Sequence, residues 1–126
     1  MNKKIIATTK APGAIGPYSQ GTATDGLVFT SGQIPFDAAT GELELQDIRK
    51  AAKHSLDNVK AILEEAGSSM DKILKTTVYL VDMGDFAAVN EVYAGYFPQD
   101  PPARSCVAVA ALPRGARVEI EAVAVR

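Results

Sequence analysis

The C-terminal part of the chain contains two strand-like runs that are apolar on both faces. The first follows Arg104 and includes residues 107–112, and the second covers residues 118–125. Strands of this kind are expected where both faces of a sheet are buried. Glu119 and Glu121 are set into the second run. Charged groups seldom enter buried strands, because desolvation costs several kcal/mol unless a partner is present. Arg104 and the two glutamates are therefore the first candidates for a site.

Turn signals and hydrophobic periodicity predict the other elements. Strands are expected at residues 4–8, 19–23, 27–31 and 73–81, helices at about residues 47–66 and 85–97, and turns at 25–26 and 37–41. The first helix has an apolar stripe at three- and four-residue spacing, with Asp47 as its cap and Gly67 at its end. Pro101 and Pro102 lead into the final pair of strands. The order β-β-β-α-β-α-β-β predicts an α+β fold with one mixed sheet of about six strands.

Two amphipathic helices can cover only one face of such a sheet. The final strands nevertheless carry apolar residues on both faces, with Ser105 and Val107 alternating with Cys106 and Ala108. The uncovered face therefore predicts self-association, with roughly 2,000 Å² or more buried in an obligate assembly.

Composition narrows the class of protein. With 126 residues, the chain is expected to form one domain, residues 1–126. Its net charge of −2 and the absence of a Lys/Arg cluster argue against a nucleic-acid partner. Cys106 and His54 are the only residues of their types, so a single chain can form neither a disulfide nor a Cys/His zinc site. We expect no metal and no cofactor.

The chain shows no signal for a membrane. The apolar stretch after the first lysines is too short for a signal peptide, and no run approaches the roughly 20 apolar residues of a membrane helix. We therefore expect a cytoplasmic protein.

Arg104 has two interpretations of similar weight. It can form a structural ion pair with an acid, or its fork of donors can hold a ligand carboxylate. Period-two geometry places Cys106 on the same strand face. A lone cysteine is most often a small buried hydrophobe, and no histidine is expected beside it, so cysteine–histidine catalysis is rejected. Cys106 can still line a pocket.

Other polar residues are weaker candidates. Glu119 and Glu121 share one strand face and can pair with the arginines at 104, 114 and 117, or one of them can hold water. Tyr18 lies in a rigid loop, and taken by itself it is more often a packing residue than a functional one. Ser31 precedes Gly32 at the end of a strand, and taken by itself it is more often a turn residue than a ligand contact. Asn90 on the second helix is predicted only to satisfy backbone groups. Glycines 13 and 16 lack the spacing of a phosphate loop.

The chain closely resembles the RidA family, also called YjgF or the L-PSP endoribonuclease family, nearly end to end. The matching segments are residues 15–20 (IGPYSQ), 30–35 (TSGQIP), 40–42 (TGE), 55–60 (SLDNVK), 75–78 (KTTV), 102–107 (PARSCV) and 118–122 (VEIEA). This many matches in order are highly specific, although each alone is weak.

The resemblance implies a chorismate-mutase-like α+β fold and a homotrimer with three clefts between adjacent subunits. The implied activity is hydrolysis of reactive enamines and imines, chiefly 2-aminoacrylate/2-iminopropanoate and 2-iminobutanoate, to 2-oxo acids and ammonia. Such species are released by pyridoxal-phosphate enzymes that act on serine or threonine.

The resemblance also implies roles for particular residues. Arg104 matches the family's substrate-binding arginine, and Glu119 matches the glutamate that positions or activates water. Tyr18 and Ser31 match residues that line the site, and backbone groups at Gly32 and Cys106 would complete it. Alanines 108 and 111 stand where many relatives carry Glu and Arg, which puts only the rim in doubt.

Two alternatives to an imine deaminase remain. One is an endoribonuclease or translation inhibitor, a label that the family also carries, although the acidic composition argues against RNA binding. The other is a non-catalytic ligand-binding or regulatory module that senses 2-oxo acids.

Overall fold

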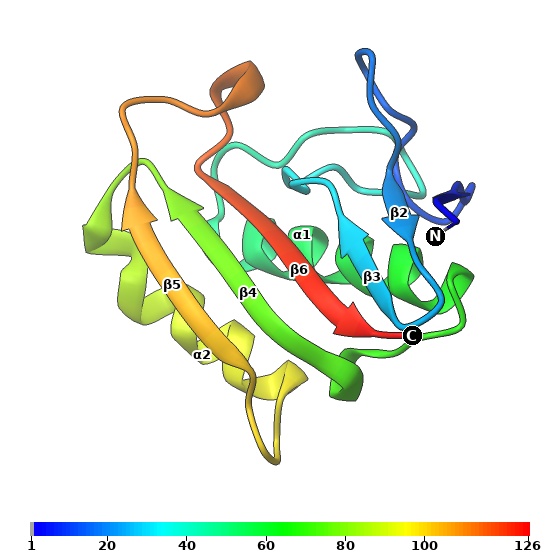
Figure 1. The fold of residues 1–126 in the computed structure, drawn as a ribbon. Helices are drawn as coiled ribbons and strands as arrows, with labels where there is room; N and C mark the ends of the chain where they lie inside the picture. The colour runs from blue at the N-terminus through cyan, green and yellow to red at the C-terminus, as the bar shows by residue number, and fades with distance from the viewer. Residues whose placement is uncertain (1) are drawn as a thin grey trace.

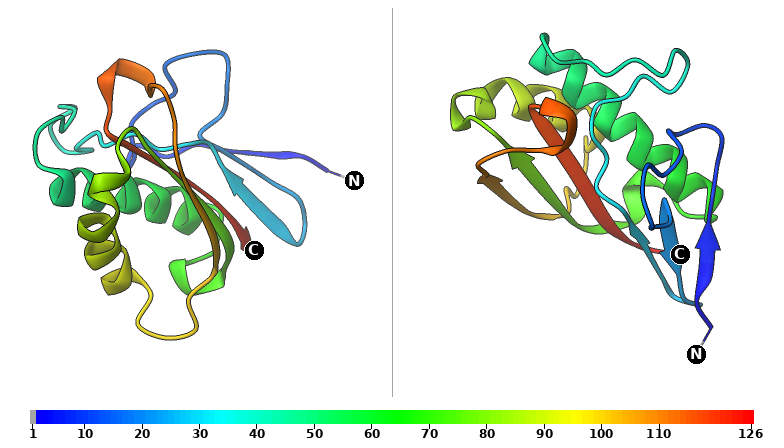
Figure 2. Two further views of the ribbon diagram at one scale, coloured as in Figure 1. Left: turned by 90° about the vertical axis from the view of Figure 1, so that its left-hand side faces the viewer. Right: turned by 90° about the horizontal axis from the view of Figure 1, so that it is seen from above.

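A computed structural model describes residues 2–126 of the chain. Six strands form one mixed sheet in the order β1-β2-β3-β6-β4-β5, with two helices on one side (Figures 1 and 2). The strands are β1 (Lys4–Ile6), β2 (Gly21–Ala23), β3 (Leu27–Thr30), β4 (Ile73–Leu80), β5 (Ala103–Ala108) and β6 (Val118–Val125), and the helices are α1 (Ile48–Glu65) and α2 (Phe86–Tyr96). The predicted α+β architecture and element order are confirmed.

The final two strands are not neighbours in the sheet. β4 lies between them and pairs parallel with β5 and antiparallel with β6. Parallel strands need a long crossover, and α2 supplies it between β4 and β5. The apolar run that begins at Val107 leaves the sheet after Ala108. Residues 109–117 form a loop instead, in which Arg114 has a backbone φ of 57°.

Local signals explain the bounds of α1. The Asp47 side chain accepts hydrogen bonds from the backbone amides of Arg49 (3.0 Å) and Lys50 (3.1 Å) at the start. Gly67 follows the helix with a φ of 83°, a conformation that glycine adopts without steric cost. The inner stripe includes the fully buried side chains of Leu56 and Leu63. Each such side chain contributes roughly 1.5–3 kcal/mol to folding through burial.

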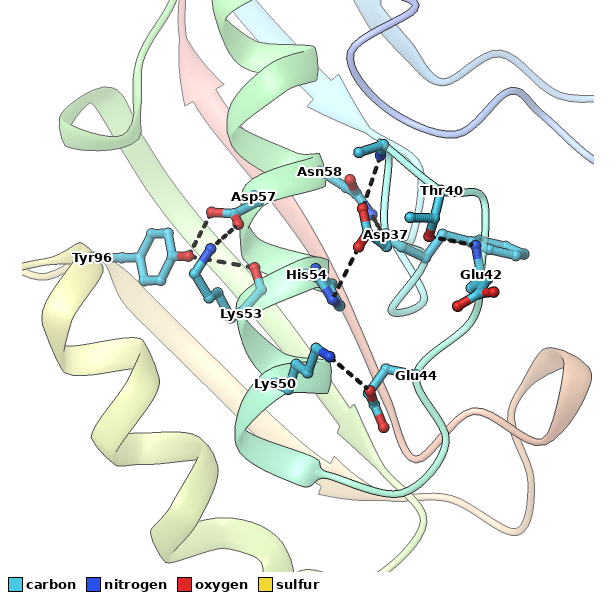
Figure 3. Close-up of polar contacts among 12 residues, drawn as sticks. Asp37, Thr40, Glu42, Glu44, Lys50, Lys53, His54, Asp57, Asn58 and Tyr96 are labelled. Atoms are coloured by element: carbon cyan, nitrogen blue, oxygen red, sulfur yellow. Dashed lines mark hydrogen bonds and ion pairs between the residues drawn. The ribbon is translucent and has the colours of Figure 1, made fainter.

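α2 packs beside α1 over the same face of the sheet. Its Val89 and Tyr93 are buried, and the Tyr93 hydroxyl lies 2.7 Å from Thr76 Oγ1 on β4. The Tyr96 hydroxyl donates to Asp57 of α1 at 2.5 Å, so a buried stripe and a surface contact both hold the helix in place (Figure 3).

The opposite face of the sheet has no helix over it. We call this the open face; it carries Phe29, Tyr79, Val107, Glu119, Glu121 and Val125. Phe29, Val107 and Val125 are 42–44% exposed. The uncovered face expected from the helix count is therefore present, and self-association through it stays a prediction. Among residues 2–126, neither helix has the length and apolar character needed to cross a membrane.

Candidate functional site

Arg104 lies on the helix face of β5, where α2 holds its side chain. Its position opposite Thr76, whose side chain is buried, directs it toward α2. The guanidinium Nη1 donates to Asn90 Oδ1 at 2.7 Å, and Cζ lies 4.8 Å from the centre of the Tyr93 ring and 5.5 Å from that of Phe86. The side chain is thus held by one hydrogen bond and two aromatic rings.

The Arg104 charge has no acid partner within the described residues 2–126. The guanidinium borders a cavity of about 380 Å³ that is also lined by Asn90, Tyr93 and Pro102. The structural ion pair considered from the sequence is therefore absent among the described residues. A guanidinium held by neutral groups beside a cavity retains donors for an incoming anion.

Cys106 shares the helix face with Arg104, as period-two geometry predicts. Burial raises the pKa of the Cys106 thiol, and the nearby Arg104 charge lowers that pKa by less. The thiol is therefore favoured over the nucleophilic thiolate. His54 lies against Asp37, with Nε2 4.0 Å from Oδ2. These positions agree with the rejection of a cysteine–histidine pair.

A second cavity, which we call the Glu119 cavity, brings together four of the predicted site residues. Tyr18, Ser31, Gly32 and Glu119 line a space of about 330 Å³. The apolar part of its wall consists of Pro12, Ile15, Ile34, Phe36 and Pro113. Ser31 Oγ donates its proton to the Ser19 carbonyl at 2.6 Å. Toward a bound ligand, this hydroxyl can therefore act only as a hydrogen-bond acceptor. The Tyr18 hydroxyl accepts from the Ile15 amide at 3.2 Å, and the residue remains 46% exposed.

The Glu119 carboxylate, which lines this cavity, has a raised pKa. Burial is the larger cause and repulsion from Glu121 the smaller, and both raise the pKa of Glu119. Within residues 2–126, neither glutamate forms an ion pair, so the predicted pairing with arginines does not occur in the chain. Glu121 instead accepts a long hydrogen bond of 3.4 Å from the Tyr79 hydroxyl. A carboxylate with a raised pKa and no counter-ion is suited to accept a proton from water.

Gly32 lies against the Glu119 carboxylate because the chain rejoins the sheet immediately after it. The Gln33 amide donates to the Ile120 carbonyl at 2.8 Å, and the Ile120 amide donates back at 3.1 Å. A β-carbon at position 32 would lie 2.7 Å from Glu119 Cδ, closer than real β-carbons approach. Glycine thus leaves room for the present position of the Glu119 carboxylate, and the backbone here needs no left-handed conformation.

Replacing Gly32 by alanine is expected to displace the Glu119 carboxylate and to lower catalytic turnover about tenfold or more, since small misplacements of a reacting group are costly. The obstructing atoms belong to a side chain that can move, so the melting temperature should change little. Gly26→Ala is the matched control, because a β-carbon there meets nothing within 4 Å and Gly26 does not line the Glu119 cavity. Equal turnover for the two variants would contradict the close-packing argument.

Gln33, Ile34 and Phe36 line one side of the Glu119 cavity. The segment that continues from them to residue 46 is tied to α1 (Figure 3). Asn58 Nδ2 donates to the Phe36 carbonyl at 2.9 Å. His54 approaches Asp37, and Lys50 Nζ lies 3.7 Å from Glu44 Oε1. These contacts hold the Phe36 side of the cavity against the helix layer.

Arg104 and Glu119 do not meet within one chain, although both were predicted for one site. Arg104 lies opposite Thr76 of β4, and Glu119 lies opposite Tyr79. These β4 residues are three positions apart, so their side chains point to opposite faces of the sheet. Arg104 and Cys106 therefore lie on the helix face, whereas Glu119 lines its cavity from the open face.

Asn90 was missed by the sequence analysis, which assigned it only to backbone groups. Its side chain is the acceptor that orients Arg104. The available signal was spacing: Phe86, Asn90 and Tyr93 follow one another at four- and three-residue intervals, which places them on one side of α2. Among residues 2–126, no three His, Cys, Asp or Glu side chains gather in a way that could hold a metal ion.

Comparison with known proteins adds independent evidence. The family model described as endoribonuclease L-PSP matches residues 8–126. The chain belongs to this family. An E. coli K12 relative named 2-iminobutanoate/2-iminopropanoate deaminase is 52% identical over 126 residues, covering 98% of each chain. A mouse relative of the same name is 50% identical over 124 residues, covering 98% of this chain and 92% of the relative.

Solved structures of the L-PSP family have the same fold. The structure of E. coli TdcF with bound serine has a TM-score of 0.94 at 52% identity, covering 98% of each chain. The YjgF gene product of E. coli has a TM-score of 0.94 at 51% identity, again covering 98% of each chain. Membership of the RidA/YjgF family, predicted from seven sequence segments, is confirmed.

Proposed function

We propose that this protein is a hydrolytic deaminase that converts 2-iminopropanoate, 2-iminobutanoate and their enamine tautomers to 2-oxo acids and ammonia. The observation that carries the proposal is that the Arg104 guanidinium and the Glu119 carboxylate each lie beside a cavity without an ion-pair partner among residues 2–126. The pKa of Glu119 is raised in a cavity shared with Tyr18 and Ser31. The names of the mouse and E. coli relatives, at 50% and 52% identity, support the same activity.

Each group then has a defined role. Arg104 binds the substrate carboxylate through two parallel hydrogen bonds. Glu119 accepts a proton from water while the water oxygen bonds to the imine carbon and the C=N π electrons move to nitrogen. Protonation of that nitrogen and loss of a proton from the new hydroxyl release ammonia and leave the 2-oxo acid. The imine carbon is already electrophilic, so binding and a positioned water provide most of the rate.

The opposite directions of Arg104 and Glu119 support a site shared by two subunits. In this proposal the open face of one subunit meets its neighbours in a homotrimer, and Glu119 of one subunit and Arg104 of the next face the same substrate. Cys106 enters the site with Arg104, and Tyr18, Ser31 and Gly32 enter it with Glu119. The exposed apolar side chains Phe29, Val107 and Val125 are the surface that such an assembly would bury.

A mixing experiment tests the shared site. Arg104→Ala and Glu119→Gln subunits are each expected to have at most about 1% of wild-type activity alone. Unfolding and refolding them together would form some interfaces in which both residues are native. Random mixing at equal amounts should restore about a quarter of wild-type activity, because each site draws one partner from each of two adjacent subunits. No recovery in mixed oligomers verified by native mass spectrometry would show that one subunit supplies both residues.

The proposed activity is tested by coupling serine or threonine dehydratase to the purified protein and following imine decay and ammonia release. The protein should accelerate imine decay and ammonia release to the same extent. Binding of 2-oxo acids without turnover would instead indicate a regulatory module. RNA cleavage that survives loss of Arg104, with no effect on imine decay, would favour the endoribonuclease alternative.

A further inference from the structure

Arg114 lies at the Glu119 cavity and has no role in the activity proposed above. Its Cζ lies 5.9 Å from the centre of the Phe36 ring, and Phe36 and the adjacent Pro113 both line the cavity. The side chain is exposed, and the backbone holds a φ of 57°. A left-handed conformation is uncommon for a residue with a long side chain and often marks functional positions. The turn thus presents a cation beside the cavity.

The charge of Arg114 is free, in contrast to that of the next arginine along the chain. Arg117 Nη2 donates to both carboxylate oxygens of Asp85, at 2.9 and 3.0 Å. Arg114 forms no ion pair with any described residue from 2 to 126. The cation–π contact with Phe36, at 5.9 Å, uses none of the guanidinium N–H groups, so these remain able to bind an anion.

The cavity is larger than a short imine requires. Its volume of about 330 Å³ is at the lower end of the range for pockets that hold drug-sized ligands, about 300–1,000 Å³. Phe36 and Pro113 give the cavity apolar walls on the side where Arg114 lies, and Glu119 repels anions. A longer substrate with a second negative group would therefore have one favourable place for that group.

We propose that Arg114 is a specificity-determining residue that binds the distal carboxylate of imino acids with two carboxylates, such as those formed by oxidation of aspartate or glutamate. The inference rests on the proposed deaminase function and extends its substrate class. Arg104 would hold the carboxylate next to the imine carbon, and Arg114 would hold the one at the far end. Because the far end takes no part in the bond changes, Arg114 acts on substrate binding and is expected to alter KM more than kcat.

The test compares two substrates made by amino-acid oxidases: 2-iminopropanoate from alanine and 2-iminosuccinate from aspartate. Arg114→Asn removes the charge and keeps a residue that tolerates the left-handed backbone. The ratio of kcat/KM for 2-iminosuccinate to that for 2-iminopropanoate should fall about tenfold, the effect of losing a charge-assisted hydrogen bond. Arg114→Lys should give an intermediate ratio, because it retains the charge and loses the fork.

Lys60→Gln is the matched control for net charge, since Lys60 is exposed on α1 and lines no part of the Glu119 cavity. A ratio within twofold of wild type in Arg114→Asn, or equal losses for both substrates, would overturn the inference. So would a wild-type protein that hydrolyses 2-iminopropanoate and leaves 2-iminosuccinate untouched. A wild-type protein that accelerates neither reaction would instead reject the proposed function itself.

Discussion

Replacing Arg104 by alanine is expected to lower kcat/KM for 2-iminopropanoate by on the order of 10²-fold or more, which corresponds to about 3 kcal/mol of lost charge pairing. The loss is large because Asn90 and two aromatic rings orient the guanidinium, which pairs with no acid in the described part of the chain. Coupled imine-decay kinetics measure the effect. Wild-type kcat/KM in a folded Arg104→Ala protein would contradict the assignment.

Asn90 offers a matched pair of variants that test the free charge of Arg104. Asn90→Asp places a carboxylate where Oδ1 now lies 2.7 Å from Nη1, so an internal ion pair would compete with the substrate carboxylate. Asn90→Ala removes the acceptor and adds no charge. KM should rise in both variants and more in Asn90→Asp, about tenfold, because charge-assisted hydrogen bonds are the stronger ones. Equal KM values would argue against competition for the guanidinium.

Replacing Glu119 by glutamine is expected to reduce kcat about 10²- to 10⁴-fold, the usual contribution of a positioned general base. Substrate binding should persist, since the amide keeps the shape of the carboxylate. Inhibition by a 2-oxo acid such as pyruvate measures that binding in the inactive variant. Loss of pyruvate binding together with turnover would show that Glu119 holds substrate and not water.

The raised pKa of Glu119 predicts opposite effects on stability and activity. The folded state favours the neutral form of Glu119. Below the ordinary pKa of 4.5 this glutamate therefore does not lower the free energy of unfolding, and it lowers that free energy as pH rises through the raised pKa. Glu119→Gln should therefore melt at a higher temperature than wild type at neutral pH and at the same temperature in acid. Activity needs the ionised form and should fall as pH is lowered through the raised pKa, above 4.5.

Features encoded within a few residues were predictable. The Asp47 cap, the Gly67 end of α1 and the Asp25–Gly26 hairpin each depend on groups close in the chain, and all three occur in the structure. Pairing of β4 with both final strands was not predictable, because it joins segments that are distant in sequence. The role of Asn90 was missed for the same reason, since its partner, Arg104, lies on another element.

The sequence by itself determined which side chains share a strand face: Arg104 with Cys106, and Glu119 with Glu121. Side chains alternate along any strand with a period of two, whatever its neighbours are. Only the tertiary structure decided that these two faces are opposite. The register of β5 and of β6 against β4 sets that relation, and it depends on packing against α2 and on the crossover that makes β5 parallel to β4.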